Sequence, residues 1–350
     1  MKPTQDPKSL GAFLGSVSSE LTTLYPGLER GDIRKLSATD NRHSWTLELS
    51  LRTGNGATEL VVKRPKSRRP MDIRTAVAGV VRTSNSLALR GGAEGLVRFP
   101  EIVGVIMDGT ALVMRRISGT RLDEAVGVGS GIDEKRCTES VQNLGKWLRS
   151  FHSASARTGD ARKTFPFQIR PYQDWGCGGV PIESCLERMG ISAQSIRIFL
   201  GSLERVCDAV PKESMRLTQT FGDFRIWNVI VSAEGDYLSD LPVVLCLDDP
   251  WRDISAMITS IEYVAARPRN LAFRKRIERQ RLIQHFVSSY FDHSLPLAES
   301  VELFKVPAML ASMEDLRRSR RIQDLAASLW IERRVRSALR KVGRASAGAQ

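Results

Sequence analysis

Alternating apolar and polar residues characterise the first third of the chain. Over 43–64 the alternation is interrupted at the turn residues Gly54-Asn55-Gly56, which predicts an antiparallel hairpin. Two shorter apolar runs predict two more strands, and a stretch of helical periodicity precedes them. The expected elements are strands at about 44–52, 58–64, 99–103 and 111–114 and a helix at about 71–90.

Helical periodicity dominates after Ile117-Ser118-Gly119. The expected helical stretches are at about 134–155, 181–209, 252–266, 274–291 and 297–340. One strand-rich patch, 226–248, lies among them. Because strands come first and helices follow, the order favours an α+β fold over a doubly wound parallel sheet. We therefore expect a small strand-rich lobe at 1–115 and a larger helical lobe at 116–350.

The composition is that of an ordinary globular protein, with 42% hydrophobic and 26% charged residues. No stretch approaches about 18 apolar residues, and the N-terminus lacks a signal-peptide core, so we expect a cytoplasmic protein. The five cysteines form no CxxC pair, which indicates free thiols in a reducing compartment and argues against zinc.

The net charge of +13 is concentrated at the C-terminus. Residues 317–350 contain ten Lys or Arg but only two acids, Asp324 and Glu332, and so contribute +8. The basic helix expected at 317–343 has a single aromatic residue, Trp330, and no zinc-finger or RNA-binding signature. These features favour a small molecule over nucleic acid as the partner.

The chemistry is concentrated in the run FGDFRIWNVIV at 221–231, where Asp223 and Asn228 stand directly before an apolar strand. A second apolar strand, 243–247, ends on Asp248. Phosphoryl transfer needs one carboxylate that accepts the proton of the incoming hydroxyl, and an amide oxygen and a second carboxylate that hold magnesium. The alternative is a capping Asp and a turn Asn without chemistry.

The run FGDFRIWNVIV resembles the HGDxxxxN motif of the aminoglycoside phosphotransferase and choline kinase family, whose fold is related to that of protein kinases. The segment VLCLDDPWRDIS resembles the magnesium-binding segment of that family. LGKWLRSFH at 144–152 resembles its helix that ends in a Phe-His pair, and LVMRRISG at 112–119 resembles its hinge. The resemblance covers about 35–290 and implies two lobes, an antiparallel-sheet N-lobe that binds nucleotide and a helical C-lobe.

The resemblance implies a kinase that moves the γ-phosphoryl group of ATP or GTP to a small-molecule hydroxyl, with Mg²⁺ as cofactor. It makes Asp223 the catalytic base, and Asn228 and Asp248 the metal ligands. Asp253 has a supporting role in this scheme, although an N-cap of the helix expected from about 254 explains it equally well.

Nucleotide contacts are implied for the N-lobe as well. Lys63, at the end of the second hairpin strand, matches the lysine that binds the phosphates. Ser44 belongs to the covering loop 39–44, which lacks glycine, so its amides approach phosphates less freely. Met114 and Arg116 lie in the hinge segment.

Two positions depart from the family pattern. Phe221 stands where the family has His, and the helix at 71–90 contains no Glu to pair with Lys63. Asp72 lies at the start of that helix and Glu94 beyond its end. A non-catalytic nucleotide-binding relative, a pseudokinase or scaffold, is therefore the alternative function. His152 and His285 lie on amphipathic helical patterns, which favours hydrogen-bonded structural histidines over catalytic ones.

Two basic segments bear on the acceptor and on location. Residues 264–281 hold seven Lys or Arg against Glu278, which disfavours a polycationic acceptor and favours a neutral or anionic one, such as a sugar or glycan precursor. Arginines separate a stripe of apolar residues that recur at helical steps, namely Ile322, Leu325, Leu329, Ile331, Val335, Leu339 and Val342. This stripe either packs on the helical lobe or rests on an anionic membrane surface, which would make the protein membrane-peripheral.

Overall fold

The computed structural model describes thirteen segments of the chain, which form two compact units. The described segments are 9–40, 44–54, 56–66, 70–90, 96–126, 132–157, 167–169, 180–209, 217–243, 245–266, 276–292, 298–317 and 322–347. The first unit combines Met1–Gly119 with Ser232–Val244, and the second combines Thr120–Val231 with Leu245–Gln350.

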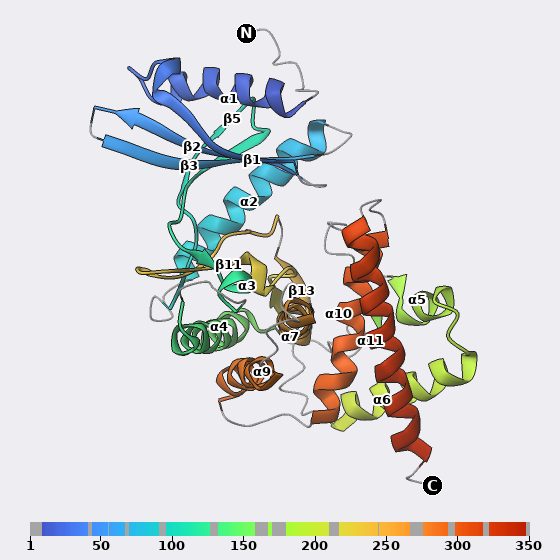
Figure 1. The fold of residues 1–350 in the computed structure, drawn as a ribbon. Helices are drawn as coiled ribbons and strands as arrows, with labels where there is room; N and C mark the ends of the chain where they lie inside the picture. Colours follow the sequence, from blue (N-terminus) through green and yellow to red (C-terminus); the bar gives the residue numbers. More distant parts are fainter. Residues whose placement is uncertain are drawn as a thin grey trace. The chain divides into compact units, whose positions relative to one another are not determined.

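The first unit is built on an antiparallel sheet of five strands in the order β1-β2-β3-β6-β5 (Figure 1). The strands are β1 (Ile33–Asp40), β2 (Ser44–Thr53), β3 (Gly56–Pro65), β5 (Ile102–Ile106) and β6 (Ala111–Arg115), and a short 3-10 turn, η1 (Arg30–Asp32), precedes them. The β2–β3 hairpin turns at Gly56, whose φ of 116° suits glycine. The predicted hairpin is confirmed, whereas β1 was not predicted.

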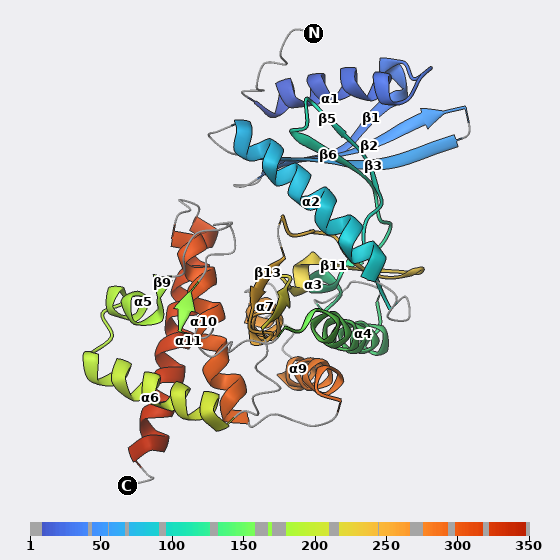
Figure 2. The same ribbon diagram turned by 180° about the vertical axis from the view of Figure 1, so that it is seen from behind.

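Two helices cover opposite faces of this sheet (Figures 1 and 2). Helix α1 (Leu10–Leu24) buries an apolar stripe against the face that carries Leu60 and Val113. Helix α2 (Pro70–Arg90) packs Ile73 and Val77 against the face that carries Leu112 and Met114. Since neighbouring residues of a strand point to opposite faces, the alternating apolar residues of β3 and β6 supply both cores.

The segment 232–244 comes late in the sequence but belongs to the first unit. Its strand β12 (Gly235–Leu238) pairs in parallel with β4 (Val97–Arg98). On α2, a Cβ at Gly79 would come within 2.5 Å of the carbonyl oxygen of Val243, and the Thr83 hydroxyl donates to the same oxygen at 3.4 Å. A glycine is therefore required where this segment crosses α2.

The second unit is mainly helical, and the described part of the chain thus combines an early sheet with later helices. This confirms the predicted α+β class. Its helices are α3 (Leu122–Ala125), α4 (Glu134–Ser155), α5 (Ile182–Arg188), α6 (Ala193–Ala209), α7 (Trp251–Ala266), α9 (Arg276–Tyr290), α10 (Ala298–Arg317) and α11 (Ile322–Ala347). Its strands are β7 (Thr120–Arg121), β8 (Gln168–Ile169), β9 (Val180–Pro181), β10 (Thr218–Thr220), β11 (Val229–Ser232) and β13 (Cys246–Asp248), and the turn η4 (Ile226–Asn228) precedes β11.

Two predicted helical stretches are each divided. The stretch at 181–209 breaks after α5, where Gly190 adopts a φ of 68° that glycine tolerates best. The stretch at 297–340 forms α10 and α11, whose described residues end at Arg317 and resume at Ile322. Periodicity alone does not show such breaks, because both halves keep an apolar face.

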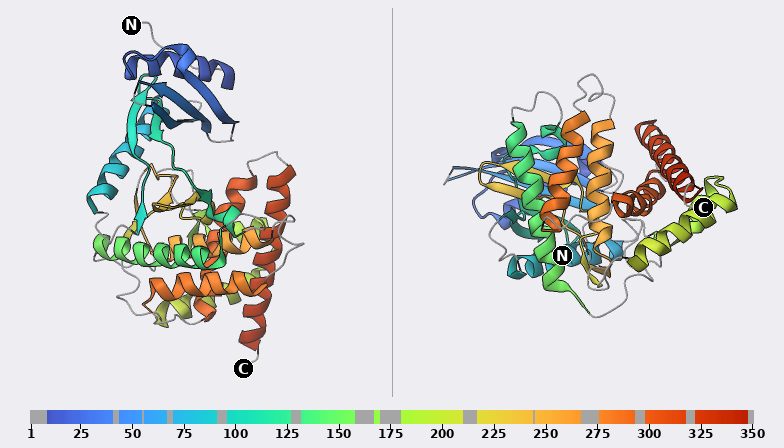
Figure 3. Two further views of the ribbon diagram at one scale, coloured as in Figure 1. Left: turned by 60° about the vertical axis from the view of Figure 1, so that its left-hand side comes forward. Right: turned by 90° about the horizontal axis from the view of Figure 1, so that it is seen from below.

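Close helix packing fixes the second unit. Helix α4 approaches α9 at Gly145, where a Cβ would lie 2.6 Å from the carbonyl oxygen of Phe286. Helices α10 and α11 lie side by side and contact α6 (Figure 3). None of the described helices is both long enough and apolar enough to cross a membrane.

The C-terminal stripe is buried where the structure describes it. Ile331, Val335 and Leu339 are at most 7% exposed, as expected of a helix that packs on its own unit. Leu329, which was assigned to the same stripe, is 52% exposed and does not belong to it. The side chains of Ile322, Leu325 and Val342 lie outside the described residues. The burial favours the packing interpretation over a membrane-facing stripe.

Candidate functional site

The loop at 221–228 is anchored by aromatic residues on both sides of Asp223. Phe221 is 2% exposed and Phe224 is fully buried, and their rings contact each other at 5.9 Å between centroids. Both rings also contact Trp147 of α4. Gly222, with a φ of 83°, provides the turn between them. The phenylalanine at 221 therefore anchors the loop by packing.

Asp253 ties this loop to α7. Its carboxylate accepts hydrogen bonds from the backbone N–H groups of Phe221 and Gly222, each at 2.7 Å. It also lies 3.1 Å from Nε2 of His152, whose Nδ1 lies 2.8 Å from the hydroxyl of Tyr290. Helix α7 begins at Trp251, so Asp253 lies inside its first turn and the N-cap interpretation is wrong.

The environment of His152 and Tyr290 is closed to solvent. His152 is 4% exposed and hydrogen-bonded on both ring nitrogens, which confirms its structural interpretation. His285 is hydrogen-bonded to Gln142. Burial raises the pKa of the Tyr290 hydroxyl well above its ordinary value, and the nearby Asp249 and Asp253 carboxylates raise it further. Tyr290 therefore stays protonated and can donate to His152.

Asp223 and Asn228 lie together, as their spacing led us to expect. The Asn228 side-chain amide donates to the backbone carbonyl of Asp223 at 3.0 Å and to its Oδ2 at 3.1 Å. The amide nitrogen of Asn228 thus faces Asp223, and the oxygen of an amide is the atom of that group that binds cations. The Asp223 side chain is 39% exposed although its Oδ1 is enclosed, so Oδ2 is the oxygen that a hydroxyl group can reach.

Arg225 pairs with Asp223 and was not among the predicted site residues. Its Nε lies 2.7 Å from Oδ1 of Asp223, and only 13% of its side chain is exposed. The sequence does place an arginine two residues after the proposed base. A cation at that distance interacts electrostatically with the carboxylate, so this spacing is the signal that could have identified Arg225.

Asp248 ends β13 as predicted, but its carboxylate is already engaged. It is 2% exposed, its Oδ2 accepts a hydrogen bond from Arg252 at 3.0 Å, and its Oδ1 accepts one from the backbone N–H of Asp249 at 2.9 Å. A metal ion at Oδ2 would have to displace Arg252 from a buried ion pair, which is costly. Asp248 therefore fits a magnesium ion poorly.

Asp249, beside it, is fully buried. Its Oδ1 accepts a hydrogen bond from the backbone N–H of Trp251 at 2.7 Å. Burial raises the pKa of this carboxyl well above its ordinary value, the bond with Trp251 lowers it, and the charge of Asp248 raises it again. Asp249 thus satisfies the backbone N–H of the first residue of α7.

Lys63 finds its carboxylate partner in the 232–244 segment. The Nζ atom of Lys63 lies 2.5 Å from Oδ1 of Asp240, and the two side chains are 30% and 42% exposed. The Asp72 side chain and Glu94, considered above as partners, lie outside the described residues. Asp240 lies two residues after β12, and Asp248 is the last residue of β13, so an aspartate at or just after the end of an apolar strand is the signal that identifies both. Its exposed carboxylate fits a magnesium ion that is also bound by nucleotide phosphates.

The remaining nucleotide-contact predictions fall on the sheet. Ser44 is the first residue of β2 and is 7% exposed, next to 41–43, which lie outside the described residues. Met114 is buried against α2. The Arg116 guanidinium lies 3.2 Å from Glu48 and 2.5 Å from Glu59, and the bond with Glu59 raises the pKa of Arg116. The Arg116 side chain thus fastens the sheet.

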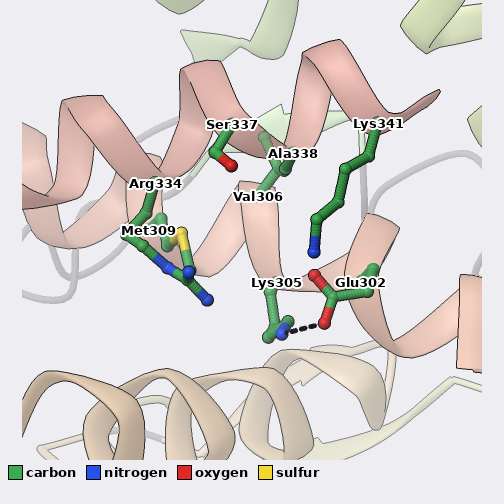
Figure 4. Close-up of a pocket in the computed structure, with 8 residues that line it drawn as sticks. All are labelled: Glu302, Lys305, Val306, Met309, Arg334, Ser337, Ala338 and Lys341. Carbon is green, nitrogen blue, oxygen red and sulfur yellow. Dashed lines mark hydrogen bonds and ion pairs between the residues drawn. The ribbon is translucent and has the colours of Figure 1, made fainter. Parts of the chain in front are cut away.

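A small pocket between α10 and α11 has the features of a closed ion network (Figure 4). Its lining residues are Glu302, Lys305, Val306, Met309, Arg334, Ser337, Ala338 and Lys341. Lys305 lies 3.0 Å from Glu262 and 2.6 Å from Glu302, and Arg334 lies 3.0 Å from Glu262. Burial alone would raise the pKa of Glu262, but the two cations outweigh it and lower that pKa. This network links α7, α10 and α11.

No known protein family and no curated protein matches the sequence. Solved structures do match it. An ethanolamine kinase of Plasmodium vivax has a TM-score of 0.56 and 11% identity, over 96% of this chain and 91% of that one. The chain has the fold of small-molecule phosphotransferases. A macrolide 2'-phosphotransferase of Brachybacterium faecium has a TM-score of 0.50 and 16% identity, over 88% of this chain and 95% of that one.

A third match among these phosphotransferases is the complex of a thermostable aminoglycoside phosphotransferase mutant with AMP-PNP and hygromycin B. Its TM-score is 0.52 with 14% identity, over 94% of this chain and 99% of that one. At these identities the similarity establishes the fold. The resemblance drawn from the motifs is confirmed at that level, and so is the protein-kinase-like fold class.

Proposed function

We propose that the protein is a kinase that transfers the γ-phosphoryl group of ATP or GTP to a hydroxyl group of a small molecule. This proposal rests on the way in which the loop is held in place while the Asp223 carboxylate stays exposed. Buried aromatic residues anchor its loop, Asp253 binds two amides of that loop, and the carboxylate itself stays 39% exposed. A firmly held and accessible carboxylate suits a group that orients a hydroxyl and accepts its proton.

Other residues supply the metal and phosphate contacts. In the second unit the Asn228 amide oxygen serves as a metal ligand. In the first unit Lys63 contacts the nucleotide phosphates, and the half-exposed Asp240 is a better metal carboxylate than the buried Asp248. Mg²⁺, when bound, neutralises charge on the phosphates. Asp253 and His152 position the loop and do not touch the reacting atoms.

The names of the similar structures support this function. One is an ethanolamine kinase, one is a macrolide phosphotransferase, and one was crystallised with a nucleotide analogue and an antibiotic. Each of these proteins is a phosphotransferase that acts on a small molecule. We propose the same reaction class here, in the cytoplasm, on a neutral or anionic acceptor such as a sugar or glycan precursor.

A non-catalytic nucleotide-binding role is the second candidate. Phe221 in place of histidine favours it, and so does the Asp223–Arg225 ion pair, which already occupies one oxygen of the carboxylate. The presence of Asp223, Asn228, Lys63 and an exposed carboxylate at Asp240 weighs against it, since binding alone does not need a base.

Nucleotide turnover by the purified protein tests the proposal. The protein is incubated with Mg-ATP or Mg-GTP and a panel of sugars, amino alcohols and aminoglycosides, and phosphorylated products are detected by mass spectrometry. Transfer to one acceptor class that depends on Asp223 supports the kinase. Tight nucleotide binding without transfer to any acceptor supports the non-catalytic alternative.

A further inference from the structure

Helix α7 contacts the 221–228 loop at a second place besides Asp253. The hydroxyl oxygen of Ser260 accepts a hydrogen bond from the backbone N–H of Ile226 at 3.0 Å. Both residues are buried, with Ser260 at 1% and Ile226 at 0% exposure. Ser260 comes two helical turns after Asp253, so the two side chains lie on the same side of α7, about 10 Å apart along its axis. One helix thus binds the loop at 221–222 and again at 226.

The Ser260 hydroxyl is oriented for this contact. It donates its proton to the backbone carbonyl of Met257 at 2.7 Å, within α7 itself. Serines inside helices commonly bond to a carbonyl of the preceding turn in this way. Because a hydroxyl has one proton and two lone pairs, an oxygen that donates to Met257 can still accept from Ile226.

The N–H group that Ser260 binds belongs to the start of a turn. Ile226 is the first residue of η4, and the first N–H groups of a helical turn find no acceptor inside it. The residue before the turn is Arg225, whose guanidinium contains only donors and therefore cannot cap it. A buried N–H group needs an acceptor from elsewhere, and Ser260 provides it.

The turn also determines where Asn228 lies. Asn228 is the last residue of η4, and its N–H closes the turn by donating to the carbonyl of Arg225 at 2.9 Å. Its side-chain amide donates to Asp223 at the distances given above. Asp253 therefore holds the loop before Asp223, and Ser260 holds it before Asn228. Contacts behind a site orient the groups that bind a metal or a reactant.

We propose that Ser260 is a positioning residue, which holds η4 so that Asn228 and Asp223 keep the arrangement that magnesium binding and phosphoryl transfer require. This inference rests on the proposed function. Ser260 acts through the backbone N–H of Ile226 and does not contact the reacting atoms.

Amide hydrogen exchange tests the contact in the free protein. Ser260→Ala removes the acceptor of the Ile226 N–H. Ser255→Ala is the matched control, because Ser255 is a serine of α7 that is also 1% exposed, and its hydroxyl has no hydrogen-bond partner in the described part of the chain. Mass spectrometry of the peptide that contains Ile226 should show about tenfold faster exchange in Ser260→Ala and no change in Ser255→Ala.

The dependence on magnesium separates positioning from stability alone. The affinity for AMP-PNP is measured over a range of magnesium concentrations. In Ser260→Ala the magnesium concentration for half of the full effect should rise about tenfold, and kcat for the best acceptor should fall about tenfold. Nucleotide affinity without magnesium should not change. A lower unfolding temperature with unchanged exchange at Ile226 and unchanged magnesium dependence would assign Ser260 a merely structural role and overturn the proposal.

A second variant covers the case in which Ser260→Ala does not fold. Ser260→Cys is nearly isosteric, but its thiol is a weak acceptor. It should change exchange and magnesium dependence in the same direction by smaller factors. Wild-type behaviour of folded Ser260→Cys in both measurements would then count against the proposal.

Failure of the kinase assignment gives a different pattern. If the wild type transfers no phosphoryl group to any acceptor, that assignment fails, while faster exchange at Ile226 and a shifted magnesium dependence in Ser260→Ala still support the role of Ser260. If the wild type is active and Ser260→Ala matches it in exchange, magnesium dependence and kcat, the kinase stands and Ser260 is not a positioning residue. Nucleotide binding that magnesium does not affect in the wild type would overturn the proposal as well.

Discussion

The Nζ atom of Lys63 lies 2.5 Å from Oδ1 of Asp240, although 177 residues separate the two in the chain. The helix at 71–90 contains no glutamate, and the carboxylate partner of Lys63 is Asp240. The pair brings a half-exposed carboxylate beside a cation that suits nucleotide phosphates, whereas Asp248 is enclosed with Arg252. Substitution of Asp240 should therefore affect nucleotide binding, whereas substitution of Asp248 should affect stability.

Asp240→Asn should weaken nucleotide binding in the presence of magnesium by about tenfold or more, because a metal carboxylate is removed. Binding without magnesium should change much less. Asp248→Asn should instead lower the free energy of unfolding by about 3 kcal/mol or more, because Arg252 loses its buried partner. Isothermal titration calorimetry with and without magnesium, together with chemical denaturation, measures both effects. Loss of magnesium dependence in Asp248→Asn alone would return the metal role to Asp248.

Asp223→Asn should reduce phosphoryl transfer by about 100-fold or more while folding and nucleotide affinity are preserved, because a positioned proton acceptor is lost. Asp208→Asn, at an exposed position of α6, is the matched control and should transfer at the normal rate. Initial rates with the best acceptor of the panel measure the difference. Undiminished transfer by Asp223→Asn would show that another group is the base.

The Asp253–His152–Tyr290 chain predicts graded effects. Tyr290→Phe removes only the outer hydrogen bond and should cost about 1 kcal/mol of stability. Asp253→Asn should change kcat by a larger factor than it changes the KM for the acceptor. The reason is that the backbone amides of Phe221 and Gly222 lose the carboxylate that holds them. Steady-state kinetics and thermal unfolding of the two variants separate these effects. Equal changes in stability and kcat for both variants would assign the chain a purely structural role.

The ion pairs of Glu262 predict that stability depends on pH in the acid range. Lys305 and Arg334 lower the pKa of Glu262 in the folded protein below its ordinary value of 4.5. The unfolded state therefore binds the proton more readily than the folded state. The contribution of the Glu262 carboxylate to the free energy of unfolding is thus present above about pH 4.5 and is lost as the pH falls through the folded pKa. Glu262→Gln should show a flatter decline of stability below that pH than wild type. Identical acid unfolding curves, measured by circular dichroism, would contradict the network.

The C-terminal helix predicts two opposite responses. Ile331→Ala removes a side chain that is 3% exposed and should cost about 2–5 kcal/mol of stability. Leu329→Ala, at a position that is 52% exposed, should change stability by no more than about 0.5 kcal/mol. Denaturant unfolding measures both. If Ile331→Ala left stability unchanged and reduced binding to anionic vesicles, the stripe would face a membrane after all.

Local sequence determined much of this protein. The β2–β3 hairpin follows from alternation and a turn, and the α+β class follows from the order of strand and helix patterns. The Asp223–Asn228 pair also follows from sequence, because five residues of one anchored loop hold the two side chains together. Such features depend on short-range geometry, which residue type and spacing encode directly.

Tertiary structure alone decided the partners of the charged groups. The choice between Asp240 and Asp248 depends on which strand end is buried and which cation lies beside it, and the Lys63–Asp240 pair forms only when 232–244 joins the first unit. The close approaches at Gly79 and Gly145 are equally non-local. A pattern of apolar residues specifies that a face is buried but not what covers it, because that depends on contacts between segments far apart in the chain.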